Sequence, residues 1–201
     1  MSEKKQSKLK QQSIGRPRSE ASKTAILTAT VDLLEESGYS TLTIEAIAAR
    51  AGVGKATIYR WWPSKPILVL DAFLMTTESS LHFQENTSIR ENFRQQLHTL
   101  ANVFNDILGR TVVALVAESG EDSEIAKDFY TNYLKPRRED AILILERAIA
   151  QGEIKEGINL DVVSDMLYGP VYFQILIYKK KVDSKFIDTL VDQVMKGIGA
   201  P

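Results

Sequence analysis

Apolar residues return every three or four positions along most of this chain after residue 19, which is the spacing of one face of an α-helix. The segment 88–108 shows this most clearly, from Ile89 through Phe93 and Leu97 to Leu108. No segment has the strict alternation that is typical of a half-buried strand. The pattern predicts an all-α fold of about nine helices, at residues 19–38, 43–52, 55–62, 64–80, 88–108, 111–117, 123–151, 159–181 and 184–197.

Capping residues and prolines mark the ends and weak points of these helices. Ser19 or Ser22 can cap the first helix and Thr43 the second, because a hydroxyl oxygen accepts a hydrogen bond from a free N–H of the first turn. Within the helix predicted at 123–151, Pro136 removes a backbone donor and clashes with the preceding turn. We therefore expect a kink or a break at that position.

The two short helices at 43–52 and 55–62 are joined by a turn that contains Gly52 and Gly54, and a longer helix precedes them. Pro63 disfavours helical backbone at the residue before it, which ends the second short helix. This is the layout of a helix-turn-helix, a unit that places its second helix in the major groove of DNA. The pattern predicts an N-terminal three-helix DNA-binding domain followed by a larger helical domain.

The second short helix is predicted to bury one face, on which Ile58 and Trp62 lie four residues apart. Its other side chains cannot all point inward as well. By geometry Arg60 suits the O6 and N7 atoms of guanine, Thr57 suits a thymine methyl group or a phosphate, and Lys55 lies at the helix start near base edges. Tyr59 and Trp61 are expected to position the DNA backbone. The alternatives are a solvated Arg60 and a Trp61 that belongs to the core.

The formal net charge of −1 combines two halves of opposite sign. Residues 1–70 hold 11 Lys and Arg against 6 Asp and Glu, whereas residues 71–201 hold 14 against 20. The positive excess lies in residues 1–24, with 7 basic and 2 acidic side chains. A basic segment beside a helix-turn-helix favours double-stranded DNA as a partner.

Residues 1–18 are predicted to be a flexible basic arm, because residues 1–14 contain too few apolar side chains to offset the entropy of ordering. The tetrapeptide Gly15-Arg16-Pro17-Arg18 resembles the core of an AT-hook, which lies in the narrow minor groove of A·T-rich DNA. Arg16 and Arg18 are therefore candidates for minor-groove contacts. The alternative is a cationic tail that adds only nonspecific affinity.

Several classes of function lack the residues that they need. The chain has no cysteine and only two histidines, 16 residues apart, so transition-metal sites and Ser-His or Cys-His catalysis are not expected. The run GVGKA at 52–56 is similar to a phosphate-binding loop but lacks the first glycine and the Ser or Thr of that motif. We predict that the protein is not an enzyme and has neither a cofactor nor a metal site.

The longest apolar stretch, 166–178, has 13 residues and includes Gly169 and Pro170, whereas a membrane-spanning helix needs about 20 residues. The lysines near the N-terminus are not followed by the apolar run of a signal peptide. The absence of cysteine agrees with a reducing compartment. We expect a cytoplasmic protein without a membrane partner.

Residues 20–70 resemble the DNA-binding domain of the TetR (tetracycline-repressor) family of bacterial transcription regulators. The matching strings are ILTAT at 26–30, TLTIEAIA at 41–48 and AGVGKATIYRWWPSK at 51–65. The C-terminal part resembles one subgroup of the family through LKPRR at 134–138, RAIAQGEI at 147–154 and LYGPVYF at 167–173. In the family, residues that match Thr43, Tyr59 and Lys65 contact DNA phosphates, so the resemblance implies that role for these three.

The resemblance also implies that the larger domain senses a ligand and dimerises. The last two helices would pair with their copies in a second subunit through Leu167, Val171, Ile175, Leu190, Val191 and Val194. A pocket for an unknown small-molecule effector would move the fourth helix, and its candidate lining is Phe73, Phe93, Leu97, Phe104, Met166, Tyr168, Tyr172 and Phe173. Periodicity alone does not separate these roles from ordinary core packing.

Together these observations predict three parts: a basic arm at 1–18, a helix-turn-helix domain at 19–66, and a ligand-sensing and dimerisation domain at 67–201. The expected function is that of a homodimeric, ligand-responsive transcription regulator, a repressor by resemblance, on a palindromic operator. Its half-sites would lie about 34 to 36 Å apart. The alternatives are a nonspecific architectural DNA-binding protein and a helical small-molecule-binding protein without a DNA role.

Overall fold

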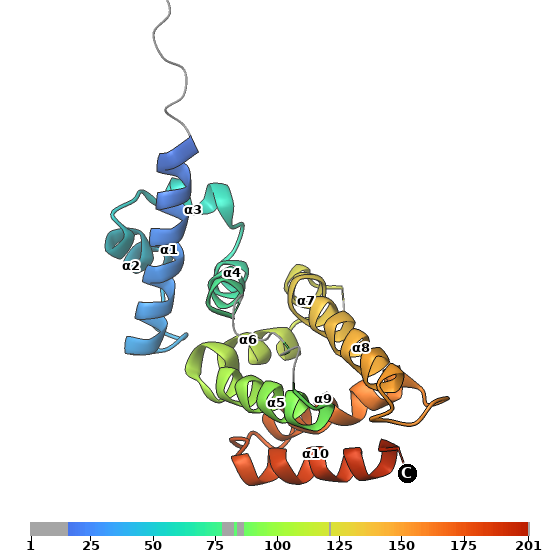
Figure 1. The fold of residues 1–201 in the computed structure, drawn as a ribbon. Coiled ribbons are helices and arrows are strands. Elements are labelled where there is room, and N and C mark those ends of the chain that lie inside the picture. The colour runs from blue at the N-terminus through green and yellow to red at the C-terminus, as the bar shows by residue number, and fades with distance from the viewer. Residues whose placement is uncertain (1–15, 78–82, 84–86, 121, 201) are drawn as a thin grey trace, which may run out of the picture.

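The computed structural model describes residues 16–77, 83, 87–120 and 122–200, which fold into helices without a strand among them (Figure 1). Because α7, η1 and α8 form one continuous rod, these residues make nine helical segments, and the predicted all-α fold of about nine helices is confirmed. The elements are α1 (Arg16–Ser37), α2 (Ile44–Ala51), α3 (Lys55–Trp61), α4 (Lys65–Thr77), α5 (Ile89–Asn105), α6 (Ile107–Glu118), α7 (Glu124–Phe129), the π-helical turn η1 (Tyr130–Leu134), α8 (Lys135–Ala150), α9 (Leu160–Leu176) and α10 (Ser184–Ile198).

Helix α1 begins at Arg16, earlier than the sequence pattern suggests. Arg16 and Arg18 therefore belong to its first turn rather than to an extended arm. Pro17 fits there because the first N–H groups of a helix have no partner within it, so a missing donor costs little. The side chains of Arg16 and Arg18 and residues 1–15 lie outside the described part of the chain.

Helices α1, α2 and α3 form the predicted helix-turn-helix unit. Thr43 caps α2 by accepting a hydrogen bond from the Ala46 N–H at 3.1 Å. The helix ends at Gly52, whose φ of 66° lies in the left-handed region that suits glycine. Arg50 of α2 forms a two-pronged ion pair with Glu36 of α1, with N···O distances of 2.8 and 2.9 Å. The shared core consists of Ile26, Leu34, Leu42, Ile47, Ile58 and Trp62.

Helix α4 lies between this unit and the larger domain (Figure 1). It packs against α1 on one side and against α6 and α7 on the other. Its apolar side chains are buried accordingly: Leu68, Val69, Leu70, Ala72 and Phe73. Because protein interiors are close-packed, these contacts hold α4 against both parts of the chain.

The helix predicted at 88–108 ends earlier than expected. Helix α5 stops at Asn105, and α6 starts at Ile107 with its axis turned by 81°. The Asp106 side chain makes the break, because its carboxylate accepts a hydrogen bond from the Ile107 N–H at 2.9 Å and so competes with helical pairing. Apolar periodicity runs through the corner because buried residues keep helical spacing across it, at Leu100, Phe104, Leu108 and Val112.

A kink or a break was predicted at Pro136, but α7, η1 and α8 continue through this position without a break. The chain instead inserts a π-helical turn, in which the Lys135 N–H bonds to the Tyr130 carbonyl five residues earlier. A proline in the first turn of the following helical segment is compatible with this arrangement. Such turns are rare and often lie at functional sites.

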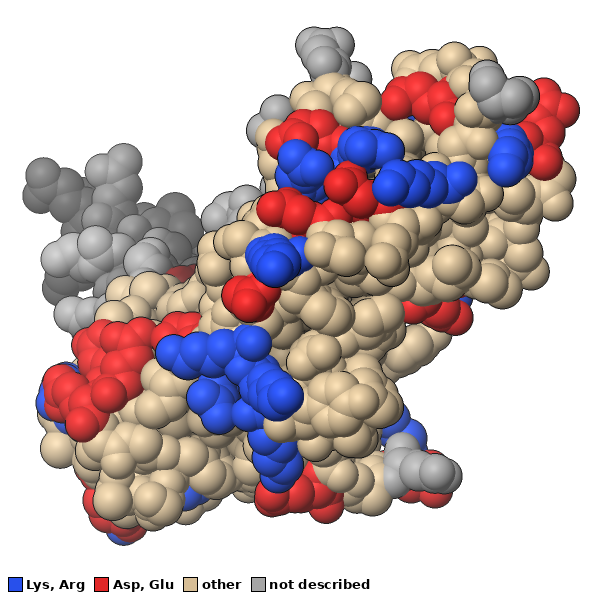
Figure 2. All heavy atoms as spheres, turned by 90° about the horizontal axis from the view of Figure 1, so that it is seen from below, with Lys and Arg blue, Asp and Glu red and all other residues tan. Residues whose placement is uncertain are grey.

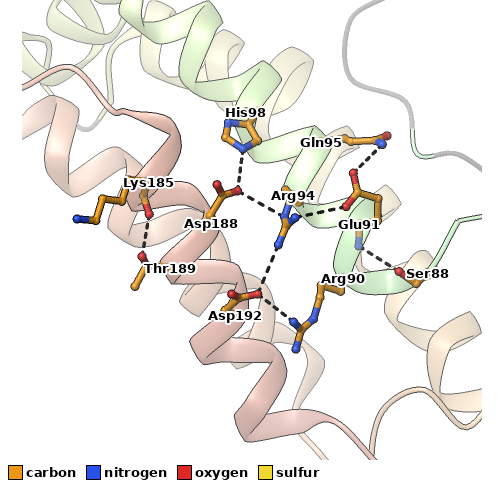
Figure 3. Close-up of polar contacts among 10 residues, drawn as sticks. All are labelled: Ser88, Arg90, Glu91, Arg94, Gln95, His98, Lys185, Asp188, Thr189 and Asp192. Atoms are coloured by element: carbon orange, nitrogen blue, oxygen red, sulfur yellow. Dashed lines mark hydrogen bonds and ion pairs between the residues drawn. The ribbon is translucent and has the colours of Figure 1, made fainter.

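Charged side chains join α5 to α10 (Figure 3). Arg90 of α5 pairs with Asp192 of α10 at 3.1 Å, and Arg94 lies 3.4 and 3.6 Å from Asp188 and Asp192. His98 Nε2 lies 3.1 Å from the same Asp188 carboxylate. Single exposed ion pairs contribute little, but basic groups on one helix and acidic groups on the other favour this helix pairing over others.

No single helix in the described ranges is long and apolar enough to span a membrane. The bent pair α5 and α6 meets the length and composition requirements only when its two members are taken together.

Candidate nucleic-acid interface and cavity

Helix α3 has one buried face and one exposed face. Ile58 is fully buried and Trp62, just after the helix, is 3% exposed, so their predicted place in the core is confirmed. Lys55, Tyr59 and Arg60 are exposed, and Tyr59 presents 54% of its surface. The opposite side of the helix therefore presents one basic and aromatic surface.

The remaining members of the predicted DNA contact set lie beside this surface. Thr57 is half-buried, and Trp61 is 37% exposed with its ring 6.2 Å from that of Trp62. Thr43 is exposed at the start of α2, where its oxygen is used as a cap acceptor and its O–H remains available as a donor. DNA contact by each of these residues stays a prediction.

Lys55 and Arg60 differ in how they are held. The Lys55 ammonium lies 2.9 Å from the Glu45 carboxylate of α2, and this hydrogen bond lowers the pKa of Glu45. Arg60 makes no hydrogen bond or ion pair with any described residue. The predicted contact of Lys55 with DNA would replace this ion pair, whereas the predicted contact of Arg60 would replace no bond to a described residue.

Lys65 has a structural role that sequence reasoning missed. Its ammonium donates to the Leu42 carbonyl at 2.9 Å and the Tyr39 carbonyl at 3.2 Å, and it lies 4.1 Å from the centre of the Tyr39 ring. These bonds tie the start of α4 to the turn between α1 and α2. A phosphate contact by Lys65 stays a prediction, and the ammonium that would make it already donates hydrogen bonds to two backbone carbonyls.

A second connection joins α4 to the end of α3. The Trp62 indole N–H donates to the Asp71 carboxylate at 2.9 Å, and Lys23 of α1 pairs with the same carboxylate oxygen at 3.3 Å. Asp71 therefore holds the end of α3 and the side of α1 from one point on α4. The position of α3 depends on that of α4.

The larger domain contains a cavity of about 290 Å³ between α5, η1, α8 and α9. Tyr168 and Tyr172, which were predicted to line a pocket, lie in its wall. The Tyr168 hydroxyl donates to the Gln96 amide oxygen. The lining residues are Gln96, Leu100, Tyr130, Leu134, Lys135, Arg137, Arg138, Ser164, Asp165, Tyr168, Gly169 and Tyr172.

Four other predicted pocket residues lie in the core and not in the cavity wall: Phe73, Phe93, Leu97 and Phe104. Phe104 nevertheless connects the wall to α4, because its ring centre is 5.5 Å from that of Tyr172 and 5.8 Å from that of Phe73. Tyr133 of η1 joins the same cluster, 4.9 Å from Phe73. An aromatic cluster thus lies between the cavity and α4.

The last two predicted pocket residues, Met166 and Phe173, lie on the outer face of α9 and are 46% and 48% exposed. Val162 and Ile177 are exposed on the same face, at helical spacing. We call Val162, Met166, Phe173 and Ile177 the α9 stripe. On the α10 side of the molecule, a broad area free of Lys, Arg, Asp and Glu lies between groups of charged side chains (Figure 2).

The residues predicted for the dimer interface lie mostly inside one chain. Leu167, Val171, Ile175, Val191 and Val194 are buried in the core, and only Leu190 is half-buried. Both α9 and α10 bury one apolar face against the chain's own helices, and the regular apolar spacing in the sequence marks that face rather than a dimer interface. The exposed side chains of the α9 stripe fall outside the regular core pattern.

Sequence reasoning missed most of the polar cavity wall, including Gln96, Arg137, Arg138 and Ser164. Polar and charged side chains in helices normally face solvent, so the helical pattern does not predict that these line a cavity. The available signal was Pro136, because the π-helical turn before it places Tyr130 and Leu134 in the wall beside Arg137. Within the described ranges no group of three or more His, Cys, Asp or Glu is arranged to hold a metal ion.

Two family profiles match this chain. The profile described as "Bacterial regulatory proteins, tetR family" matches residues 26–72. The profile described as "Tetracyclin repressor-like, C-terminal domain" matches residues 83–194. The two matched segments contain the helix-turn-helix unit and the cavity.

Relatives and solved structures agree with these profiles. The uncharacterized HTH-type transcriptional regulator YdeS of Bacillus subtilis is 34% identical over 186 residues, which are 92% of this chain and 94% of the relative. The solved TetR family transcription regulator SCO0332 has a TM-score of 0.74 at 32% identity, over 88% of this chain and 97% of that one. FadR of Bacillus subtilis, solved in complex with stearoyl-CoA, shares the fold with a TM-score of 0.64 at 21% identity, over 87% and 98% of the chains.

Proposed function

This chain belongs to the TetR family of DNA-binding transcriptional regulators, and we propose that it is a homodimeric, ligand-responsive repressor that binds a palindromic operator. The observation that carries the proposal is the exposed face of α3. Lys55, Tyr59 and Arg60 are exposed there, while Ile58 and Trp62 fix the opposite face in the core.

In the proposed complex α3 lies in the major groove. Arg60 reads guanine by donating two hydrogen bonds to its O6 and N7 atoms, and Thr57 meets a thymine methyl group or a phosphate. Thr43, Tyr59 and Lys65 contact phosphates, which fixes the position of the domain on the duplex. Trp61 adds to the backbone contacts, and Arg16 and Arg18 extend them into the minor groove.

We propose the α9 stripe as the centre of the dimer interface. Its side chains form an unpaired apolar face on a helix whose other faces are used by the core and the cavity. A twofold axis through this face would place the same residues of both subunits against one another. The two copies of α3 would then meet half-sites about 34 to 36 Å apart.

The cavity is the proposed effector site. Its volume of about 290 Å³ lies at the lower end of the range for small-molecule sites, about 300 to 1,000 Å³. The aromatic cluster of Phe73, Phe104, Tyr133 and Tyr172 provides a path from the wall to α4. Occupation of the cavity would move α4 and, through Asp71 and Trp62, the end of α3.

The proposed division of the chain keeps residues 19–66 as the DNA-binding domain and residues 67–201 as the sensing and dimerisation domain. Members of the family are transcriptional regulators rather than enzymes, so we propose no catalytic activity. Because the proposed operator is genomic DNA, the proposed location of the protein is the cytoplasm. Nonspecific architectural binding remains the second candidate function, because the basic excess of residues 1–24 attracts any duplex.

Selection of bound fragments tests the proposal. The full-length protein is incubated with fragments of the genome that encodes it, and retained fragments are sequenced and footprinted. We expect a shared palindrome that is protected symmetrically about its centre. Retention without a shared sequence supports the architectural function, and no retention at low salt contradicts both.

A further inference from the structure

One cavity residue reaches from the cavity wall to α4. Arg137 lines the cavity, and its Nη2 donates a hydrogen bond at 3.2 Å to the carbonyl of Thr77, the last residue of α4. Its Nη1 donates to the Tyr133 carbonyl at 2.9 Å, and its guanidinium lies 3.7 Å from the centre of the Tyr133 ring. A single side chain therefore joins the cavity, η1 and the end of α4.

The charge of Arg137 is not neutralised by any described residue. Both acceptors of its hydrogen bonds are uncharged carbonyls, and no carboxylate in the described ranges forms an ion pair with it. Its Nε atom is buried and has no hydrogen-bond partner. Desolvation of an unpaired cation is costly, so this site favours an anion from outside the chain.

The other basic residues of the cavity wall are already paired. Arg138 binds Asp161 at 3.0 Å and Asp165 at 2.5 Å, and Lys135 lies 3.9 Å from Glu139. The same pairing with Arg138 neutralises Asp165, the acidic residue of the wall. Arg137 is thus the wall cation that lacks an ionic partner in the described structure.

The rest of the wall is apolar or uncharged. Leu100, Leu134 and Gly169 supply aliphatic surface, and Tyr168 and Tyr172 supply rings. Burial raises the pKa of both tyrosines far above the usual value, so their hydroxyl groups remain neutral at physiological pH. Such a wall suits a compact aryl or alkyl body that carries one acidic group.

We propose that Arg137 is the effector-sensing residue, and that it binds the carboxylate of a small, largely apolar acid and gives up its hydrogen bond to the Thr77 carbonyl. This inference rests on the proposed role of the cavity as an effector site. A planar guanidinium matches a carboxylate with two parallel hydrogen bonds, and such charge-assisted bonds are about twice as strong as bonds between neutral groups.

Loss of the bond to the Thr77 carbonyl removes one of the contacts at the C-terminal end of α4. The same helix holds the end of α3 through the 2.9 Å hydrogen bond between Trp62 and Asp71. The arrival of an anion at Arg137 is thereby linked to the position of the DNA-reading helix. Effector binding and DNA binding then change each other's affinity by the same factor.

Matched acid and amide probes test the inference on the full-length protein. The probes are phenylacetate, 4-phenylbutyrate and octanoate, each with its neutral primary amide, and binding is measured by calorimetry without DNA. We expect at least one acid to bind about tenfold or more tightly than its amide. In Arg137→Gln the acid should bind no better than the amide, whereas Arg147→Gln, on the exposed part of the same helix, should keep the preference.

Arg137→Lys separates sensing from a merely structural role. It keeps the charge but loses the planar fork, so we expect a reduced preference for the acid rather than none. Equal binding of acid and amide, a preference that survives Arg137→Gln, or no binding of any acid at millimolar concentration overturns the proposal. Failure of the wild-type chain to retain any DNA contradicts the proposed function instead and leaves the acid preference of the cavity intact.

Discussion

At the scale of single residues, the basic side chains predicted to contact DNA from α3 and from the start of α4 differ in the partners that they already have. Lys55 is paired with Glu45, and Lys65 is tied to two backbone carbonyls, whereas Arg60 has no partner among the described residues. Sequence reasoning placed Ile58 and Trp62 in the core because their spacing requires a common face. It did not find the partners of Lys55 and Lys65, because such contacts depend on neighbouring helices.

Arg60→Ala tests the base-reading role. Loss of a two-pronged contact to guanine should cost about 1 to 3 kcal/mol of operator binding and relax specificity at one base pair. Competition between operator variants, followed by fluorescence anisotropy, measures both effects. Arg110→Ala removes the same charge from the exposed surface of α6 and should leave discrimination unchanged. Intact discrimination in Arg60→Ala rules out the assignment.

Lys65→Met tests the structural role of the α4 ammonium. The variant keeps most of the side-chain stem and removes a charged donor from two carbonyls, so the free energy of unfolding should fall by about 2 kcal/mol. Urea unfolding without DNA measures this. Lys55→Met, at an exposed and ion-paired position, should change stability by about 0.5 kcal/mol or less. Equal stability of the two variants would assign Lys65 to DNA binding alone.

At the scale of elements, periodicity predicted where helices exist but not where they turn. The corner between α5 and α6 was not predicted, because buried residues keep helical spacing across it, and its cause is the capping carboxylate of Asp106. A kink or a break was predicted at Pro136, whereas the chain forms a π-helical turn just before it and continues as a helix. Periodicity predicted which residues of α9 and α10 are buried, but it did not distinguish packing within one chain from packing against a second subunit.

Gly109→Ala tests the tight corner. A Cβ atom at this position would lie 2.1 Å from the Val103 carbonyl oxygen, so backbone must move to admit it. We expect a loss of about 1 to 3 kcal/mol in the free energy of unfolding. Gly197→Ala in α10, where a Cβ meets nothing within 4 Å, should instead be neutral or stabilise by up to about 1 kcal/mol. A thermal unfolding series that ranks the two variants the other way contradicts this packing.

At the scale of the whole molecule, α4 packs against both the helix-turn-helix unit and the larger domain, and we propose that it couples the two. It is held by Lys65 and Asp71 towards the DNA-reading unit and by Thr77 towards the cavity. The net charge of −1 likewise combines a basic excess in residues 1–24, which favours attraction to DNA, with an acidic excess in residues 71–201, which DNA repels. The family resemblance of residues 20–70 predicted a DNA-binding unit followed by a larger sensing domain. The shape of the cavity could not be predicted, because it depends on how the helices pack.

Phe173→Glu tests the proposed dimer. A carboxylate in the α9 stripe would be buried against its own copy, so the variant should sediment as a monomer at concentrations at which the wild type is a dimer. Leu143→Glu is the matched control, because Leu143 on α8 is 49% exposed and Phe173 is 48% exposed. If the Phe173 variant still forms dimers, or if the control is a monomer, the α9 stripe is not the centre of the dimer interface.

The most informative measurement on the intact protein is the ratio of its affinities for the selected palindrome and for a scrambled duplex of equal composition, followed over a range of salt concentrations. We predict a preference of about a thousandfold or more at physiological salt, with both affinities falling as salt rises. Equal affinity for the two duplexes at every salt concentration would contradict a sequence-reading α3 and leave only nonspecific attraction.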